Sequence, residues 1–115
     1  MKVLIAGGSG FLGSHLCKKF LDNEYEVICL DNLGSGRKEN ISEFMNNTNF
    51  KFIQADVSKD LNKIEKVDLI LHFASRASPF DYQEKSFETI EANTLGTKNL
   101  LEKAKKDNAI ILYAS

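Results

Sequence analysis

A glycine-rich run directly follows a short apolar segment at the N-terminus of this chain. The apolar segment covers residues 3–6, and the glycines after it show the spacing Gly8-x-Gly10-x-x-Gly13, overlapped by Gly7-x-x-Gly10-x-x-Gly13. An apolar strand that stops, turns in little space and opens a helix needs glycine in its turn. The backbone N–H groups at such a helix start attract a pyrophosphate. The run therefore fits a dinucleotide-binding fingerprint, although a lone glycine triplet also occurs in ordinary loops.

Each glycine of the fingerprint has a different predicted role. One makes the turn, one lets the phosphates approach the backbone, and one lets the helix lie close to the strand. At Gly10 a β-branched side chain would occupy the phosphate space and disfavour a positive φ. The predicted phosphate-binding residues are Gly7, Gly10, Phe11, Leu12 and Gly13.

An acidic residue at the end of a second apolar run supports the fingerprint. Residues 26–30 are typical of a buried strand, and Asp31 follows Gly8 at close to the separation of about 20 residues expected of a ribose-binding acid. Its carboxylate can accept both ribose hydroxyls and would repel a 2′-phosphate, so the sequence favours NAD over NADP. Arg37 and Lys38 could accommodate that phosphate, but a solvated loop pair is their more ordinary interpretation.

The composition limits the chain to one domain or part of one. It has 115 residues, 43% of them hydrophobic, and a formal net charge of −1. This length can bury one core but is short for a complete enzyme of this architecture. No basic stripe suggests nucleic acid, no apolar stretch reaches the ~20 residues that span a bilayer, and no signal-peptide pattern precedes the first strand. We expect small-molecule or protein partners, no nucleic acid, no membrane and a cytoplasmic location.

The cysteines and histidines do not form a metal or redox set. Cys17 and Cys29 lie on a predicted helix and a predicted buried strand, where packed thiols are more common than ligands. His15 and His72 have no neighbouring Cys or His to complete a ligand set, so we interpret both as structural. No metal site is predicted.

Strand and helix patterns alternate along the chain, which is typical of a parallel sheet covered by helices on both faces. Right-handed crossovers then give the order 3-2-1-4-5, with the reversal between the first and fourth strands. The predicted fold is α/β, a Rossmann-type doubly wound parallel sheet truncated after the fifth strand, and residues 1–115 form the N-terminal part of an NAD-binding domain. Strands are predicted at residues 2–6, 26–30, 50–54, 68–72 and 109–114, and helices at 11–22, 38–46, 59–65 and 83–106.

The ligand crevice of such a sheet lies at the carboxyl ends of its strands, where the strand order reverses. Asp56 is placed there to accept from the adenine amino group, with Val57 against the ring. Equally, Asp56 could cap the helix expected near Ser58. The loop after the second strand is rich in turn residues and could fold over the adenosine. The other candidates at this edge are Asn32, Ser35, Gly36, Phe73, Ala74, Ser75 and Ser115.

Together, these residues resemble those of the extended short-chain dehydrogenases that act on nucleotide sugars. The resemblance implies NAD as the cofactor and adds Asn93 to the cofactor-binding residues. It also implies a homodimer, because the long helix resembles one of the helices that pair at the family's dimer interface. The matching segments are 7–13, 31–33, 56–57, 72–74 and 93–97, within a resemblance that runs from Met1 to Ser115.

Within that family, the segments 36–40 and 72–79, followed by Tyr82, look most like UDP-glucuronate decarboxylases. Arg76 departs from the proline usual in that subfamily. An extra cation there could suit a sugar carboxylate or mark another substrate. The resemblance implies a UDP-sugar as the partner, with Arg76, Ser78 and Tyr82 as substrate-binding residues.

The family's catalytic residues are expected outside this sequence. After a fifth strand like residues 110–115, family members continue with a catalytic Ser or Thr and then a Tyr-x-x-x-Lys pair, so we expect them beyond Ser115 and no activity of the chain alone. UDP-glucose 4-epimerase and dTDP-glucose 4,6-dehydratase share these motifs and are alternatives to the decarboxylase. A non-catalytic module that senses NAD(H) is the alternative of another class.

Overall fold

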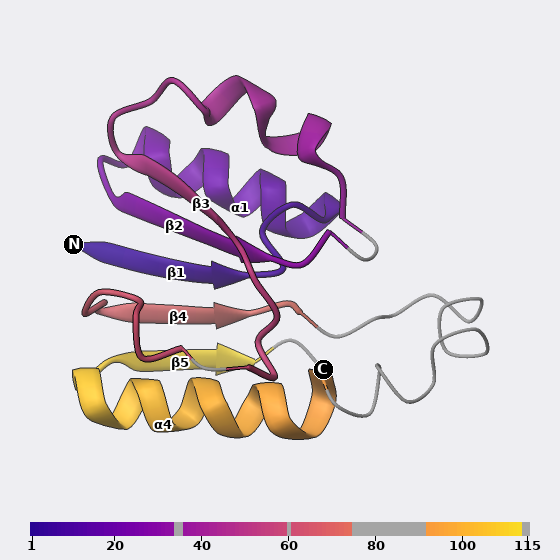
Figure 1. Ribbon diagram of the computed structural model, residues 1–115. Helices are drawn as coiled ribbons and strands as arrows, with labels where there is room; N and C mark the ends of the chain where they lie inside the picture. Colours follow the sequence, from indigo (N-terminus) through magenta and orange to yellow (C-terminus); the bar gives the residue numbers. More distant parts are fainter. Residues whose placement is uncertain (34–35, 60, 75–91, 114–115) are drawn as a thin grey trace.

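The computed structural model of the chain describes residues 1–33, 36–59, 61–74 and 92–113. Its centre is a parallel sheet with the order β3-β2-β1-β4-β5, which confirms the predicted strands and their order (Figure 1). The helical segments are α1 (Phe11–Asp22), the 3₁₀ helix η1 (Lys38–Phe44), the π-helix η2 (Ala92–Gly96) and α4 (Thr97–Asp107). The strands are β1 (Lys2–Ala6), β2 (Glu26–Asp31), β3 (Phe50–Gln54), β4 (Leu69–His72) and β5 (Ile110–Tyr113).

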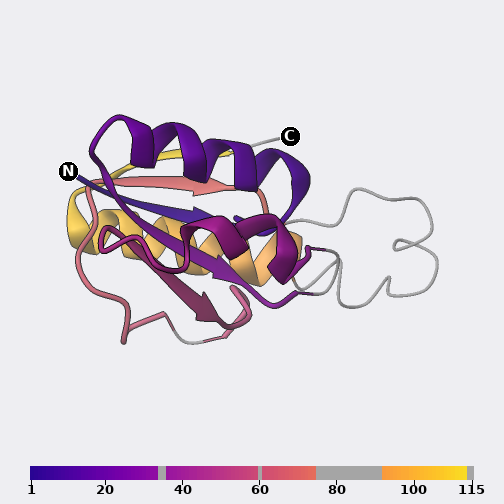
Figure 2. The same cartoon turned by 90° about the horizontal axis from the view of Figure 1, so that it is seen from above.

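The central strand β1 is buried on both faces, and its side chains alternate between two hydrophobic clusters. Val3 and Ile5 pack on the side covered by α1 and η1. Leu4 and Ala6 pack on the opposite side, with Leu100 of α4. Figures 1 and 2 show α1 beside β1 and β2, and α4 beside β4 and β5. Burial on both faces explains why β1 is a continuous apolar run rather than an alternating one.

The predicted helix at residues 38–46 is a 3₁₀ helix over Lys38–Phe44 rather than an α-helix. The backbone N–H of Asn40 donates to the carbonyl of Arg37 at 3.0 Å, and its side chain donates to the carbonyl of Ser9 at 2.8 Å. Such i→i+3 bonds and side-chain bonds outside the helix favour a short 3₁₀ segment. Contact with the glycine run therefore shapes η1.

The helix predicted at residues 59–65 is wrong, because the described residues of this segment form a turn and bends and no helix. The ammonium of Lys103 on α4 donates to the carbonyls of Ile64 at 3.1 Å and Glu65 at 2.9 Å. Hydrogen bonds from a distant element thus satisfy backbone groups that a local helix would otherwise pair.

The long helix predicted at residues 83–106 is described from residue 92 onward, as η2 followed by α4, and residues 83–91 lie outside the described part. The helix ends at Asp107, where Asn108 has a left-handed φ of 55° and the N–H of Ala109 donates to the carbonyl of Ala104 at 2.8 Å. Asn tolerates this cap conformation well. Neither α4 nor any other helix of the described segments is long and apolar enough to cross a bilayer.

Candidate dinucleotide-binding site

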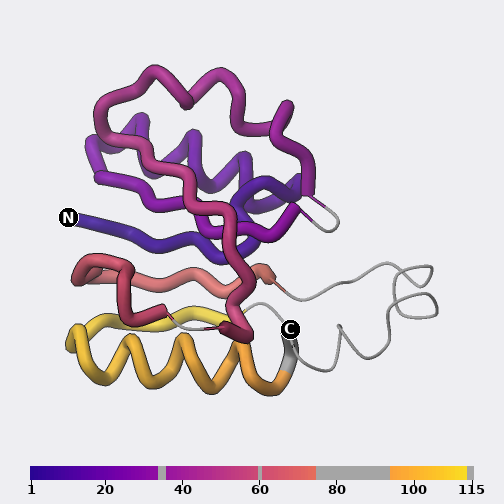
Figure 3. Tube along the Cα trace, in the orientation of Figure 1, coloured from indigo at the N-terminus to yellow at the C-terminus, as the bar shows by residue number. Residues whose placement is uncertain are grey.

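The candidate site lies at the edge of the sheet where the carboxyl ends of the parallel strands come together. Figure 3 shows that the chain leaves β1, β2 and β4 at this edge and that α1 begins beside it. β1 pairs with β4 although the two are distant in sequence, so the strand order reverses between them. The ends of the strands that carry the predicted residues are therefore neighbours in space.

Two glycines of the run are required by backbone geometry. Gly7 has φ 85°, and its N–H donates to the carbonyl of Leu30 at 2.7 Å. A Cβ at Gly13 would collide with the carbonyl oxygen of Gly7 and lie 2.8 Å from the Cα of Gly8. Gly7 therefore makes the turn, and Gly13 lets α1 lie against it.

Gly10 corrects one prediction. Its φ of −73° and ψ of 177° are ordinary extended values, so the expected positive φ is wrong and belongs to Gly7 instead. A Cβ at Gly10 would meet only the carbonyl oxygen of Gly7, at 3.4 Å, and would otherwise project into open space. No side chain caps the start of α1, where Phe11 and Leu12 are exposed. The open space faces unpaired helix N–H groups, as a pyrophosphate requires.

Gly8 serves packing beneath the turn. A Cβ there would lie 2.5 Å from the sulfur of Cys29 and 3.2 Å from that of Cys17. Both thiols are free and buried, and the hydrogen bond with Cys17 together with burial raises the pKa of Cys29. The structure thus agrees with packed thiols, and the spacing Gly7-x-x-Gly10-x-x-Gly13 describes the turn better than the spacing that begins at Gly8.

The Asp31 carboxylate is held by two backbone N–H groups. One oxygen accepts from Ser9 at 3.0 Å and the other from Leu33 at 2.7 Å. Leu33 has a left-handed φ of 62°, which its bond to Asp31 helps to hold. The carboxylate is thereby oriented at the end of β2, beside the phosphate turn, and each oxygen retains a lone pair for a ligand.

Ser9 joins the phosphate turn to the following loop, a contact that sequence reasoning did not predict. Its carbonyl accepts from the backbone N–H of Arg37 at 3.1 Å and from the side chain of Asn40. A Cβ at Gly36 would collide with the Ser9 hydroxyl and lie 3.0 Å from the Asp31 carboxylate, so glycine permits this close approach. The Arg37 side chain itself is exposed. No residue pattern signals a contact made through backbone carbonyls.

Asp56 and Val57 lie at the end of β3, next to the start of α4. One carboxylate oxygen of Asp56 accepts from the N–H of Ser58 at 2.9 Å and from its hydroxyl at 2.8 Å. Asp56 therefore closes a turn rather than capping the expected helix. Val57 is buried, and a Cβ at Gly96 would lie 2.5 Å from its Cγ2. Gly96 thus allows α4 to begin close against Val57.

Phe73 and Ala74 follow β4 directly and are half-buried. His72 before them is buried and hydrogen-bonded within the protein, in agreement with a structural role. Asn32 is exposed. Asn93 lies in η2. The remaining predicted residues lie outside the described part of the chain: Ser35, Ser75, Arg76, Ser78, Tyr82 and Ser115.

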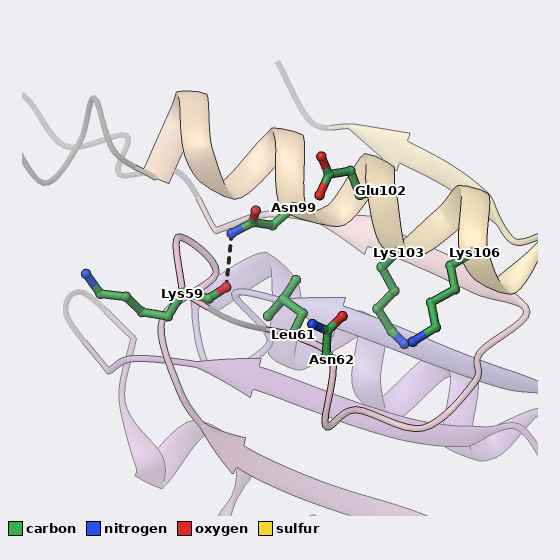
Figure 4. Close-up of a pocket in the computed structure, with 7 residues that line it drawn as sticks. All are labelled: Lys59, Leu61, Asn62, Asn99, Glu102, Lys103 and Lys106. Atoms are coloured by element: carbon green, nitrogen blue, oxygen red, sulfur yellow. Dashed lines mark hydrogen bonds between the residues drawn. The ribbon is translucent and has the colours of Figure 1, made fainter.

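A separate hollow of about 330 Å³ lies between α4 and the turns after β3 (Figure 4). Asn99 bridges its two walls, because its side-chain amide donates to the carbonyls of Val57 at 2.9 Å and Lys59 at 3.0 Å. None of the predicted site residues lines this hollow. The residues that line it are Lys59, Leu61, Asn62, Asn99, Glu102, Lys103 and Lys106.

The chain is similar in sequence and in structure to known proteins. The model of the NAD dependent epimerase/dehydratase family matches residues 3–115. The chain belongs to this family. Members of this family depend on NAD, which is the cofactor that the glycine fingerprint and Asp31 predict. The resemblance inferred from the sequence is therefore confirmed.

Three relatives show the range of the family. UDP-glucuronic acid decarboxylase 1 of Danio rerio is 42% identical over 114 residues, which are 99% of this chain and 27% of that protein. UDP-glucose 4-epimerase of Thermotoga maritima with UDP-glucose has a TM-score of 0.86 and 30% identity, over 100% of this chain and 38% of that one. A dTDP-glucose 4,6-dehydratase of Streptomyces venezuelae with NAD and TYD bound has a TM-score of 0.84 and 28% identity, over 96% of this chain and 38% of that one. The chain thus spans little more than a quarter of the length of that decarboxylase.

Proposed function

We propose that residues 1–115 form the NAD-binding part of a nucleotide-sugar enzyme of the UDP-glucuronate decarboxylase type. The observation that carries this proposal is the open space at Gly10 before the uncapped start of α1, with Asp31 at the end of the neighbouring strand. A pyrophosphate fits the first position and a ribose the second. The identity to a UDP-glucuronic acid decarboxylase over almost the whole chain supports the substrate class.

In this proposal each strand end holds one part of the dinucleotide. The N–H groups at the start of α1 bind the phosphates, and Asp31 accepts the ribose hydroxyls with lone pairs that Ser9 and Leu33 leave unused. Asp56 and Val57 hold the adenine, and Phe73 and Ala74 border the cofactor from β4. The other proposed cofactor-binding residues are Gly7, Gly10, Phe11, Leu12, Gly13, Asn32, Ser35, Gly36, Ser75 and Asn93, and the proposed substrate-binding residues are Arg76, Ser78 and Tyr82.

The proposed reaction needs groups outside these residues. NAD, when bound, supplies a hydride acceptor that can return the hydride to a ketone. The described residues bind and orient the dinucleotide, whereas the Tyr-x-x-x-Lys pair that moves the sugar proton is absent from these 115 residues. We therefore expect no turnover of UDP-glucuronate, UDP-glucose or dTDP-glucose by the chain alone.

Titration calorimetry of the chain with NAD and NADP tests the proposal. We expect NAD to bind more tightly, because a 2′-phosphate would meet the Asp31 carboxylate. Tighter binding of NADP would overturn the cofactor assignment and direct attention to Arg37. Gly10→Val should abolish NAD binding. Circular dichroism is the control, and the native spectrum should persist because the φ of Gly10 suits any residue.

Two further parts of the proposal concern the whole protein. Exposed apolar side chains on η2, α4 and β5 favour association into a homodimer, which sedimentation of the chain would detect; a strictly monomeric chain at high micromolar concentration would count against it. The exposed side chains are Leu95, Leu101, Ile110, Leu112 and Tyr113.

We also propose a cytoplasmic location. A 4-epimerase or 4,6-dehydratase is the rival within the family, since structures of both enzymes are similar to this chain.

A further inference from the structure

A histidine side chain at the end of β4 is hydrogen-bonded to the backbone that follows the strand. His72 ends β4 and is 1% exposed. The N–H of Phe73 still follows the sheet and donates to the carbonyl of Ala6 at 2.7 Å. The next N–H, that of Ala74, leaves the sheet and donates to Nδ1 of His72 at 3.3 Å. The imidazole, rather than a neighbouring strand, thus satisfies the first backbone donor beyond the sheet.

These contacts determine where the imidazole carries its proton. Because Nδ1 accepts from Ala74, the proton of the neutral ring lies on Nε2, which donates to the hydroxyl of Thr97 on α4 at 3.1 Å. Burial lowers the pKa of His72 and favours this neutral form. The neighbours of His72 are Ala6 on β1, Thr97 on α4 and Tyr113 on β5. The Tyr113 ring packs edge-on against the imidazole, with the two ring centres 5.0 Å apart. Only Tyr113 among these three can titrate.

The peptide that His72 holds also touches the phosphate turn. A Cβ on Gly7 would collide with the carbonyl oxygen of Phe73 and lie 3.0 Å from the N of Ala74. The Phe73–Ala74 peptide is therefore packed directly against Gly7, the residue with the left-handed φ that makes the turn before α1. Interiors packed this closely transmit displacements, so a shift of the peptide changes the turn.

We infer that His72 is a positioning residue for the dinucleotide: it links Thr97 of α4 to Ala74 and holds the Phe73–Ala74 peptide against Gly7. The β1 and β4 sides of the site then keep one geometry, and α4 helps to set it. This inference rests on the proposed binding of NAD. His72 acts through the peptide and not by contact with the reacting atoms.

Three substitutions of His72 distinguish the effect of its hydrogen bond from Ala74 from the effect of its hydrogen bond to Thr97. In His72→Asn the side-chain oxygen takes the position of Nδ1, which keeps the bond from Ala74 and loses the one to Thr97. In His72→Gln the amide reaches the position of Nε2, which keeps the bond to Thr97 and loses the one from Ala74. His72→Phe keeps a ring against Tyr113 and loses both. By calorimetry we expect the Asn variant to bind NAD within about threefold of wild type, and the Gln and Phe variants about tenfold more weakly or worse.

Nitrogen-15 spectra of the imidazole provide a readout that does not depend on NAD. We expect a protonated Nε2 and an unprotonated Nδ1 in the wild-type chain. We also expect the Ala74 amide to be protected from hydrogen exchange in the wild-type chain and, among the three variants, only in His72→Asn. Equal NAD affinity in all three variants, or a proton on Nδ1, would overturn the positioning role and leave the proposed function intact. A folded wild-type chain with the expected tautomer that binds no NAD would overturn the proposed function instead.

Discussion

The two faces of the sheet hold their loops by different means. On the α1 face, the path of the turn over residues 7–13 is set by backbone geometry, through the left-handed φ of Gly7 and the close contact at Gly13. On the α4 face, the turns over residues 61–67 are held by side chains that reach in from α4. A loop that depends on its own backbone leaves glycines at fixed spacing in the sequence. A loop that depends on a distant helix leaves no such pattern.

A buried ion pair lies on the α4 face of the sheet. Lys103 and Asp107 lie 2.8 Å apart with side chains 6% and 5% exposed, and Asp107 also accepts from the N–H of Val67 at 3.1 Å. With the carbonyls of Ile64 and Glu65, the ammonium has three acceptors for its three protons. Although burial raises it, the bonds from Lys103 and Val67 hold the pKa of Asp107 below its usual value. Each charge thus has an oppositely charged partner and further hydrogen bonds, which is the condition for tolerating buried charges.

The largest expected effect is on this face. Lys103→Met should lower the free energy of unfolding by about 3–5 kcal/mol, because it leaves the Asp107 carboxylate buried without its partner. Urea unfolding measures the change. Lys105→Met, two residues further along α4 at an exposed site, is the matched control and should change stability by less than about 0.5 kcal/mol. Equal effects of the two substitutions would show that the turns are held by something other than the ion pair.

On the α1 face, two glycines of the turn over residues 7–13 should differ in effect: Gly7 should matter for stability and Gly10 for NAD binding. Gly7→Ala should destabilise the chain by about 3 kcal/mol, because its φ is left-handed and its Cβ would meet the Phe73 carbonyl. Gly10→Ala should cost about 1 kcal/mol or less, since its φ is ordinary and it only replaces glycine at a helix N-cap. Yet Gly10→Ala should weaken NAD binding in calorimetry. If Gly10→Ala destabilised the chain as much as Gly7→Ala, the division of roles between the glycines would be wrong.

A smaller effect is expected where the two faces meet, at His72. Burial lowers the pKa of His72 in the folded chain, so the unfolded chain binds more protons near its ordinary pKa of about 6.5. The stability that His72 contributes is thus complete above about pH 6.5 and is lost as the pH falls through the lowered folded value. Unfolding in urea between neutral pH and pH 5 should show this loss. The loss should persist in His15→Gln, which alters an exposed histidine, and disappear in His72→Asn.

The smallest effect concerns the one buried side-chain oxygen without a partner among the described residues. The hydroxyl of Ser9 is buried and has no hydrogen-bond partner in the described part of the chain, although its backbone joins the turn to η1. Ser9→Ala should therefore leave stability unchanged or raise it by up to about 1 kcal/mol. Ser14→Ala, which removes a bond of 3.0 Å to the carbonyl of Phe11, is the comparison and should not stabilise. A clear loss of stability in Ser9→Ala would mean that its hydroxyl has a partner after all.

Sequence reasoning succeeded where structure is local or periodic. The five strands and their order followed from apolar runs and from the handedness of crossovers, both of which act on any chain with this alternation. It failed at residues 59–65 and misjudged η1, because those segments form hydrogen bonds with α4 and with the glycine run. It also placed the positive φ on Gly10 instead of Gly7. The spacing shows that the turn needs glycine, but it does not show which of the glycines has the left-handed φ.

The residue pattern alone predicts the parallel sheet, the glycine turn and the acidic residue that ends β2, whereas the family was inferred from the resemblance of whole motifs. The sheet, the turn and the acid follow from residue types at fixed spacing, because strand period, helix period and turn chemistry are properties of short segments. The packed structure was needed to see that Gly10 faces open space, that Ser9 links two loops through its carbonyl, and that His72 joins α4 to the residues that pack on the phosphate turn. Those contacts bring together residues distant in sequence, and their geometry exists only once both faces of the sheet are packed.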